Sequence, residues 1–168
     1  EVGFYRVVMP PNQPSWKVRM TPLQGEAMLI AATNRMPNVD SEKRVQKFGK
    51  EHYVLLPGQN ASTLLPGTNY LAIVSEGTTS NATAIGTGLS TVRLETLGNM
   101  PETHLGVLTT DDLTISTSLE GGESAAYHFD TMPGILGFWL MLEDTVGNPW
   151  MVSRGDPDLA DPGLGGDT

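Results

Sequence analysis

Apolar and polar residues alternate with a period of two along much of this chain. In Trp16-Lys17-Val18-Arg19-Met20-Thr21 every second side chain is apolar, and residues 113–119 repeat the pattern with mainly β-branched residues. Because successive side chains of an extended strand point to opposite faces of a sheet, this alternation predicts half-buried strands. The pattern and the residue types predict further strands at residues 5–9, 28–32, 52–56, 70–75, 91–97 and 127–131.

Turn-forming residues separate these expected strands. Pro57-Gly58, Pro66-Gly67 and Gly147-Asn148-Pro149 are examples, since proline and glycine favour the backbone angles of tight turns. Helical spacing with capping residues is rare, and residues 41–50 have room for one or two helical turns at most. Short strands separated by turns of this kind predict an all-β fold, an antiparallel jelly-roll-like β-sandwich.

The two ends of the chain match each other at a constant shift of 122 residues, which is the difference between Tyr127 and Tyr5. A self-match at a fixed shift indicates tandem repeats. We therefore expect parts of two tandem units, a first sandwich at residues 1–97 and a second unit at residues 105–168, joined by a linker at residues 98–104. The identical residues at this shift are Glu1 and Glu123, Tyr5 and Tyr127, Pro11 and Pro133, and Gly25 and Gly147.

The repeat leaves the two units incomplete at opposite ends. Thr168 corresponds to position 46, so the second unit has no counterpart of residues 47–97, and the first has no counterpart of residues 113–119. Unpaired sheet edges promote aggregation, so the missing strands need a source. The favoured source is a longer tandem array of which this chain is an excerpt. The alternatives are residues 113–119 folding back into the first unit, and a strand donated by a neighbouring chain.

The second unit contains a series of short motifs, given at the end of this paragraph, in a characteristic order. The first unit adds Leu65-Pro66-Gly67, which is followed by a strand at residues 70–74. This order resembles the bacterial pre-peptidase C-terminal domain, a small jelly-roll-like β-sandwich found beside secreted enzymes. The resemblance implies a non-catalytic module of an extracellular or cell-surface protein, and some relatives of that family bind matrix polymers or calcium. The motifs are Gly122-Glu123, Tyr127-His128-Phe129-Asp130, Met132-Pro133-Gly134, residues 138–142, residues 144–149 and Met151-Val152-Ser153-Arg154-Gly155.

Charge and composition exclude several kinds of protein. The net charge is −9, from 10 basic and 19 acidic residues, which argues against binding to nucleic-acid phosphates. No apolar stretch is long enough to cross a bilayer, so no membrane insertion is expected. Glu1-Val2-Gly3-Phe4 lacks the basic start and apolar run of a signal peptide, which suggests a mature segment or an excerpt of a longer protein.

No coherent catalytic set is found, so we do not expect an enzyme. The chain has no cysteine, which excludes disulfides, cysteine-ligated zinc and thiol catalysis. Its histidines, His52, His104 and His128, lack the spacing of a zinc site, and no Gly-x-Ser-x-Gly motif marks a serine nucleophile.

Four aspartates stand among glycines and prolines near the C-terminal end: Asp156, Asp158, Asp161 and Asp167. Oxygen ligands on a loop suit calcium, but the spacing does not match the EF-hand pattern. A solvated acidic loop is therefore the favoured interpretation, and a calcium site at these aspartates is the alternative.

The sharpest local signal comes from comparing the two units. The strand at residues 16–20 is apolar on its inward face and basic on its outward face. Its counterpart at residues 138–142 is apolar on both faces, because Trp139 and Met141 take the outward positions. Burying a tryptophan contributes about 2–3 kcal/mol, so a cover over these residues is expected. Trp150 adds another aromatic side chain to this predicted interaction surface.

The sequence thus predicts a non-catalytic extracellular module for assembly or adhesion, without a required cofactor. Its expected partners are other copies of the same repeat or the rest of the parent chain. The alternative is an accessory module of a secreted hydrolase that binds extracellular polysaccharide or a matrix protein, with calcium as its cofactor.

Overall fold

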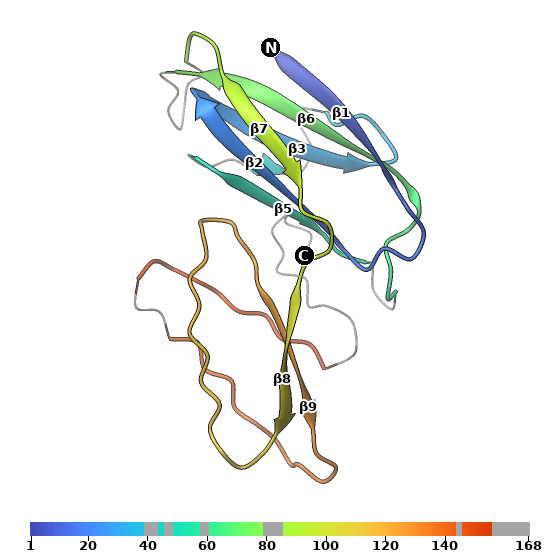
Figure 1. The fold of residues 1–168 in the computed structure, drawn as a ribbon, viewed down its shortest axis with the longest axis vertical. Helices are drawn as coiled ribbons and strands as arrows, with labels where there is room; N and C mark the ends of the chain where they lie inside the picture. Colours follow the sequence, from blue (N-terminus) through green and yellow to red (C-terminus); the bar gives the residue numbers. More distant parts are fainter. Residues whose placement is uncertain (39–43, 46–48, 58–60, 79–85, 144–145, 156–168) are drawn as a thin grey trace.

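The computed structural model describes residues 1–38, 44–45, 49–57, 61–78, 86–143 and 146–155. Within these residues the chain forms nine strands and no helix, so the predicted all-β class is confirmed (Figure 1). No helix that could span a membrane is found in this described part. The strands are β1 (Val2–Met9), β2 (Trp16–Gln24), β3 (Glu26–Thr33), β4 (Arg44–Val45), β5 (Glu51–Leu55), β6 (Gly67–Gly77), β7 (Thr91–Thr96), β8 (Glu102–Leu108) and β9 (Ala126–Thr131).

The first seven strands form a sandwich of two antiparallel sheets. One sheet has the order β1-β6-β3-β4 and the other has the order β5-β2-β7. The two sheets pack face to face, as Figure 1 shows. Every ladder in them is antiparallel. The predicted antiparallel sandwich is therefore present, between Val2 and Thr96.

The core between the two sheets explains the alternation in β2. The inward side chains Trp16, Val18 and Met20 are 4%, 0% and 0% exposed, and they pack with Leu29 of β3 and Leu71 of β6. Burial of such side chains provides about 1.5–3 kcal/mol each, which is the main force that holds the sheets together.

The central strands of the four-stranded sheet are apolar on both faces. Residues 27–32 of β3 are all buried. Met28 and Ile30 form a second cluster with Ala72 and Val74 of β6, their direct ladder partners, on the face away from the main core. A strand buried on both faces carries a continuous apolar run, which is why β3 shows no period-two signal.

The chain after residue 100 contains much less regular structure. β8 and β9 pair in parallel, with Thr103 opposite Tyr127 and Leu108 opposite Thr131. β8 begins inside the predicted linker at residues 98–104. The described residues that follow β9 form no strand, and this includes the expected strand at residues 138–142.

A further local prediction was wrong. Residues 113–119 form no strand, and all of them are exposed. An alternating pattern gives a strand only where a neighbouring backbone accepts its hydrogen bonds, and this segment neither finds such a neighbour nor folds back into the first sandwich.

Of the range with room for one or two helical turns, residues 41–50, the structure describes Arg44–Val45 and residues 49–50. Arg44–Val45 form β4 opposite Ile30 and Leu29, and the other residues of this range lie outside the described part.

The connection between the two parts of the chain is anchored on β2. The backbone N–H of Lys17 donates to the carbonyl of Gly98 at 2.8 Å, and Leu97 N–H donates to the carbonyl of Lys17 at 2.8 Å. The backbone N–H of the buried Met100 then donates to Ser15 Oγ at 2.8 Å. These bonds fix the direction in which the chain leaves the first sandwich.

Candidate functional site

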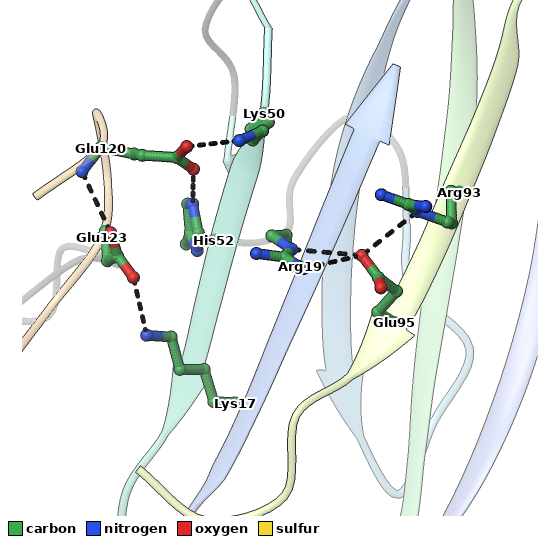
Figure 2. A network of polar contacts seen from close by, with 8 residues as sticks. All are labelled: Lys17, Arg19, Lys50, His52, Arg93, Glu95, Glu120 and Glu123. Atoms are coloured by element: carbon green, nitrogen blue, oxygen red, sulfur yellow. Dashed lines mark hydrogen bonds and ion pairs between the residues drawn. The ribbon is translucent and has the colours of Figure 1, made fainter. Parts of the chain in front are cut away.

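A network of charged side chains lies on the outer face of the three-stranded sheet (Figure 2). It joins β2, β5 and β7 to the turn at residues 120–123, which approaches from the second part of the chain. On the β7 side, the Glu95 carboxylate lies 3.1 Å from an Arg19 guanidinium nitrogen and 3.4 Å from Arg93 Nε. The contact with Arg19 links β2 to the neighbouring β7, whereas the contact with Arg93 lies within β7.

The other side of the network joins the two parts of the chain. Lys17 Nζ lies 3.2 Å from Glu123 Oε1, and His52 Nε2 lies 3.3 Å from Glu120 Oε2. Lys50 forms an ion pair with the same Glu120 carboxylate. We call these five residues the glutamate latch.

The turn itself orders the two carboxylates of the latch. The backbone N–H of Glu120 donates to Glu123 Oε2 at 3.1 Å, and the backbone N–H of Glu123 donates to the Glu120 carbonyl at 2.9 Å. Glu120 and Glu123 therefore reach the sheet as a pre-arranged pair, which reduces the entropy lost in forming the contact.

Electrostatics favours the charged form of both glutamates. The hydrogen bond from Lys50 lowers the pKa of Glu120, and the hydrogen bond from His52 acts in the same direction. The backbone N–H of Glu120 lowers the pKa of Glu123, and Lys17 adds to this effect. Each positive neighbour stabilises the carboxylate, so both groups are ionised at neutral pH.

The latch also contains the atoms of a potential metal site. One ligand atom each from His52, Glu120 and Glu123 lies within 4.8 Å of the others. His52 is 1% exposed, while both carboxylates already contact lysine ammonium groups. A cation would have to compete with Lys17 and Lys50 for the same oxygens. The arrangement is therefore better suited to holding the turn against the sheet than to binding a metal.

Sequence reasoning missed this latch because its members are far apart along the chain. Lys17 and Glu123 are separated by 106 residues, and His52 and Glu120 by 68. The only signal was the outward position of Lys17 on β2, and that position is buried beneath the turn. Neither the spacing nor the residue types of Glu120-Gly121-Gly122-Glu123 indicate which strand they approach.

A second group of ionisable side chains lies on β8 and β9. The rings of His104 and His128 stack with centroids 4.5 Å apart. His104 Nε2 lies 3.2 Å from Asp130 Oδ2, and His128 Nδ1 lies 3.3 Å from Glu102 Oε2. About half of each histidine side chain is exposed, so water screens these contacts and they stabilise the pair only weakly.

The predicted interaction surface is exposed. Trp139, Met141 and Trp150 are 88%, 69% and 58% accessible to solvent. Exposed large apolar side chains of this kind are candidates for contact with a partner when they form one continuous patch. The four aspartates proposed for calcium, Asp156, Asp158, Asp161 and Asp167, lie outside the described residues.

Of the three residues predicted at inward positions, Phe138 and Leu142 are exposed and Leu140 is partly buried. The side chains 122 positions earlier in the sequence are buried in the two apolar clusters of the first sandwich. The pairs, with their exposed fractions, are Trp16 (4%) and Phe138 (54%), Met20 (0%) and Leu142 (45%), Met28 (7%) and Trp150 (58%), and Ile30 (0%) and Val152 (41%).

Comparison of the chain with protein-family models, curated proteins and solved structures finds no match.

Proposed function

We propose that this chain is a non-catalytic module for assembly or adhesion in a secreted or cell-surface protein, of the pre-peptidase C-terminal type. Its mechanism is the burial of the apolar surface around Trp139 and Met141 against another copy of the same repeat. The observation that carries the proposal is the contrast between equivalent positions, which are buried in the first sandwich and exposed in the second unit.

The contrast favours assembly because, in the first sandwich, the strands that cover the equivalent side chains belong to the repeat itself. Another copy of the repeat would therefore supply a similar cover. In the first sandwich, residues equivalent to Phe138 and Leu142 are covered by strands of the same unit. An apolar surface of this kind gains free energy when it leaves water, at about 25 cal/mol for each Å² buried. A second copy offers sheet edges and apolar faces that match it.

Light scattering across a hundredfold range of protein concentration tests this function. We expect the average mass of the chain to rise with concentration. Trp139→Ala should weaken the association about 10- to 30-fold, because the substitution removes roughly 1.5–2 kcal/mol of apolar burial.

Leu65→Ala is the matched control, since Leu65 is 79% exposed but lies between β5 and β6 of the first sandwich and is not part of the proposed surface. It should leave the association unchanged. A mass that stays that of one chain at every concentration would contradict assembly between separate chains.

The exposed aromatic side chains also support a second candidate, an accessory module that binds extracellular polysaccharide or a matrix protein. Tryptophan rings bring large apolar area with few rotatable bonds, and Trp139 and Trp150 are both accessible. Calcium at Asp156, Asp158, Asp161 and Asp167 belongs to this candidate. Retention on an insoluble polymer, lost in Trp139→Ala and in the presence of a calcium chelator, would favour it over assembly.

A further inference from the structure

β1 is an edge strand of the four-stranded sheet, with a partner strand on one side only (Figure 1). It pairs with β6 along its whole length, from Val2 opposite Val74 to Met9 opposite Gly67, without a shift in register. Among the residues that the structure describes, no other strand pairs with β1. A strand in this position presents a row of unpaired backbone N–H and C=O groups, which can pair with a further strand.

The hydrogen bonds to β6 identify the backbone groups on the other edge of β1. Ser75 N–H donates to the carbonyl of Glu1 at 3.1 Å, so Glu1 and every second residue after it direct their backbone groups towards β6. The backbone groups of the intervening residues point to the unpaired edge. These four outward residues are Val2, Phe4, Arg6 and Val8.

The side chains of the four outward residues lie on the face of the sheet away from the main core. Val2 packs against the second apolar cluster, on β3 and β6, whereas Val7 and Met9 pack in the main core. Phe4 and Val8 are 49% and 65% exposed. The unpaired edge is therefore bordered by apolar side chains, which gain free energy when a partner covers them.

Within the described residues, the other edge strands of the sandwich are β4, β5 and β7, and each has a feature that hinders pairing. β4 has only two residues, and β5 is engaged by the turn at residues 120–123 through His52. β7 carries the charged Arg93 and Glu95, and its ladder with β2 contains a shift in register. Short strands, charges, bulges and covering loops are the usual protection of a sheet edge. β1 has eight residues, no proline, and Arg6 as its one charged residue.

We propose that β1 pairs with β1 of a second copy of this chain, antiparallel and about a two-fold axis at Tyr5, so that the two four-stranded sheets become one. In this register Val2 of one copy lies opposite Val8 of the other, and Phe4 lies opposite Arg6. The contact uses none of the residues around Trp139 and Met141. It is therefore a second interaction surface, beyond the one in the proposed function.

The residue pairs of this register favour a second copy as the partner. The Arg6 guanidinium meets the exposed Phe4 ring, which attracts a cation, and Val2 and Val8 form an apolar pair. Tyr5, which is 48% exposed, meets its own equivalent at the axis. Each outward backbone group then lies opposite another outward group, so the hydrogen bonds of an antiparallel ladder can form.

Other antiparallel registers of two β1 strands are less favourable. A shift by one residue would place outward backbone groups opposite groups that are already bonded to β6. A shift by two residues in one direction would place Arg6 opposite Arg6, and like charges directly opposite each other are destabilising. The same shift in the other direction would leave Val8 beyond the end of the partner strand. The two-fold register at Tyr5 avoids all three faults.

Light scattering of the Trp139→Ala chain separates this contact from the one around Trp139. We expect its mass to rise with concentration to that of two chains, because β1 is unchanged. Adding Arg6→Pro should weaken this association at least about 30-fold, since each copy loses an edge donor. A proline at an outward position removes no hydrogen bond to β6, so the sandwich should remain folded. Urea unfolding followed by the fluorescence of the buried Trp16 checks this.

Two charge variants in the same Trp139→Ala background test the register without a proline. Phe4→Lys should weaken the dimer about 10-fold, because it places a like charge opposite Arg6. Combining Phe4→Lys with Arg6→Glu should restore the association, because opposite charges then face each other across the axis. Both positions are exposed, so neither change disturbs the core.

Hydrogen exchange identifies the backbone contact in the dimer. The amides of the four outward residues should exchange at least about 10-fold more slowly as the concentration rises. The amides of Gly3, Tyr5 and Val7 should show little change, because β6 protects them in the single chain as well.

A Trp139→Ala chain that keeps the mass of one chain at every concentration would overturn this inference and leave the β1 edge to a strand of another protein. So would a dimer that the combined charge variant fails to restore, or one in which the outward amides exchange as fast as in the single chain. These failures leave the proposed function untouched, because assembly through Trp139 is judged by the difference between the unsubstituted chain and Trp139→Ala.

Discussion

At the scale of single residues, Glu51 shows how a buried ionisable side chain takes part in the sandwich. Its side chain is fully buried on β5, and its Oε2 accepts a hydrogen bond from the backbone N–H of Leu29 on β3 at 2.7 Å. A carboxyl oxygen that receives a backbone donor in this way joins the edge strand β5 of one sheet to the inner strand β3 of the other. The contact is side chain to backbone, so the acceptor oxygen matters more than the charge.

We predict that Glu51→Leu lowers the free energy of unfolding by about 2–3 kcal/mol, because it leaves the Leu29 N–H buried without this acceptor. Glu51→Gln keeps an oxygen in the same place and should cost about 1 kcal/mol. Urea unfolding followed by the fluorescence of the buried Trp16 measures both variants. Equal losses would show that the hydrogen bond to Leu29 contributes little.

At the scale of elements, the end of β6 depends on one glycine. Gly77 has φ of +78°, in the left-handed region, and a Cβ there would lie 2.7 Å from the carbonyl carbon of Gly86. Gly86 N–H donates to the carbonyl of Glu76 at 2.7 Å, so the two backbones cannot separate without losing a bond. The ladder between β3 and β6 also shifts register at this end, between Glu26 and Ala27.

Gly77→Ala should therefore cost about 2–4 kcal/mol, from backbone strain and from the clash with Gly86. Gly49→Ala is the matched control, since Gly49 has φ of +88° but open space around its Cβ position. It should cost only the strain, about 1–2 kcal/mol. Thermal unfolding of both variants separates the two contributions, and similar losses would mean that the clash is relieved elsewhere.

The sequence predicted a strand correctly where an alternating segment also has neighbouring strands with which to pair. Residues 16–21 alternate and lie between β5 and β7, so β2 forms as expected. Residues 113–119 alternate equally well and form no strand, because the pattern describes faces and says nothing about partners. β8 was missed because Gly106, with φ of +86°, interrupts the alternation beside a shift in register.

The candidate functional residues also fall into two groups, those that the sequence predicted and those that it missed. The apolar positions Trp139 and Met141 follow from the match at a shift of 122 residues and from the period of two, both of which can be read from the sequence alone. The glutamate latch follows from neither, because Glu120 meets His52 only after the chain has folded. Long-range contacts between charged residues leave no trace in sequence spacing.

At the scale of the whole molecule, the glutamate latch is a charged contact between the turn at residues 120–123 and the first sandwich. The pKa values of Glu120 and Glu123 are lowered in the folded chain, chiefly by Lys50 for Glu120 and by the backbone N–H of Glu120 for Glu123. A group with a lowered pKa stabilises the contact above its ordinary pKa, and this contribution is lost as the pH falls through the lowered value.

We predict that acidification through and below the usual glutamate range, near pH 4, loosens the second unit while the first sandwich keeps its core. Small-angle X-ray scattering at dilute concentration should show a larger radius of gyration at low pH. The double variant Glu120→Gln and Glu123→Gln should be expanded already at neutral pH, with a smaller change on acidification. An unchanged radius in the variant at neutral pH would mean that the bonds around Ser15 and Met100 hold the two parts unaided.

β1, β2 and β3 make no ladder with one another, and this constrains the order of events on the ribosome. Val2 pairs with Val74, 72 residues later, so β1 waits for its neighbour through several seconds of translation, roughly 4–14 s. In a tandem polypeptide the waiting strands of one unit are within reach of the β4–β7 segment of the unit before it. Near-identical repeats would exchange strands under these conditions. The change from Lys17 and Arg19 to Trp139 and Met141 makes the two units unlike on one face, which favours correct pairing of each nascent strand with its own unit.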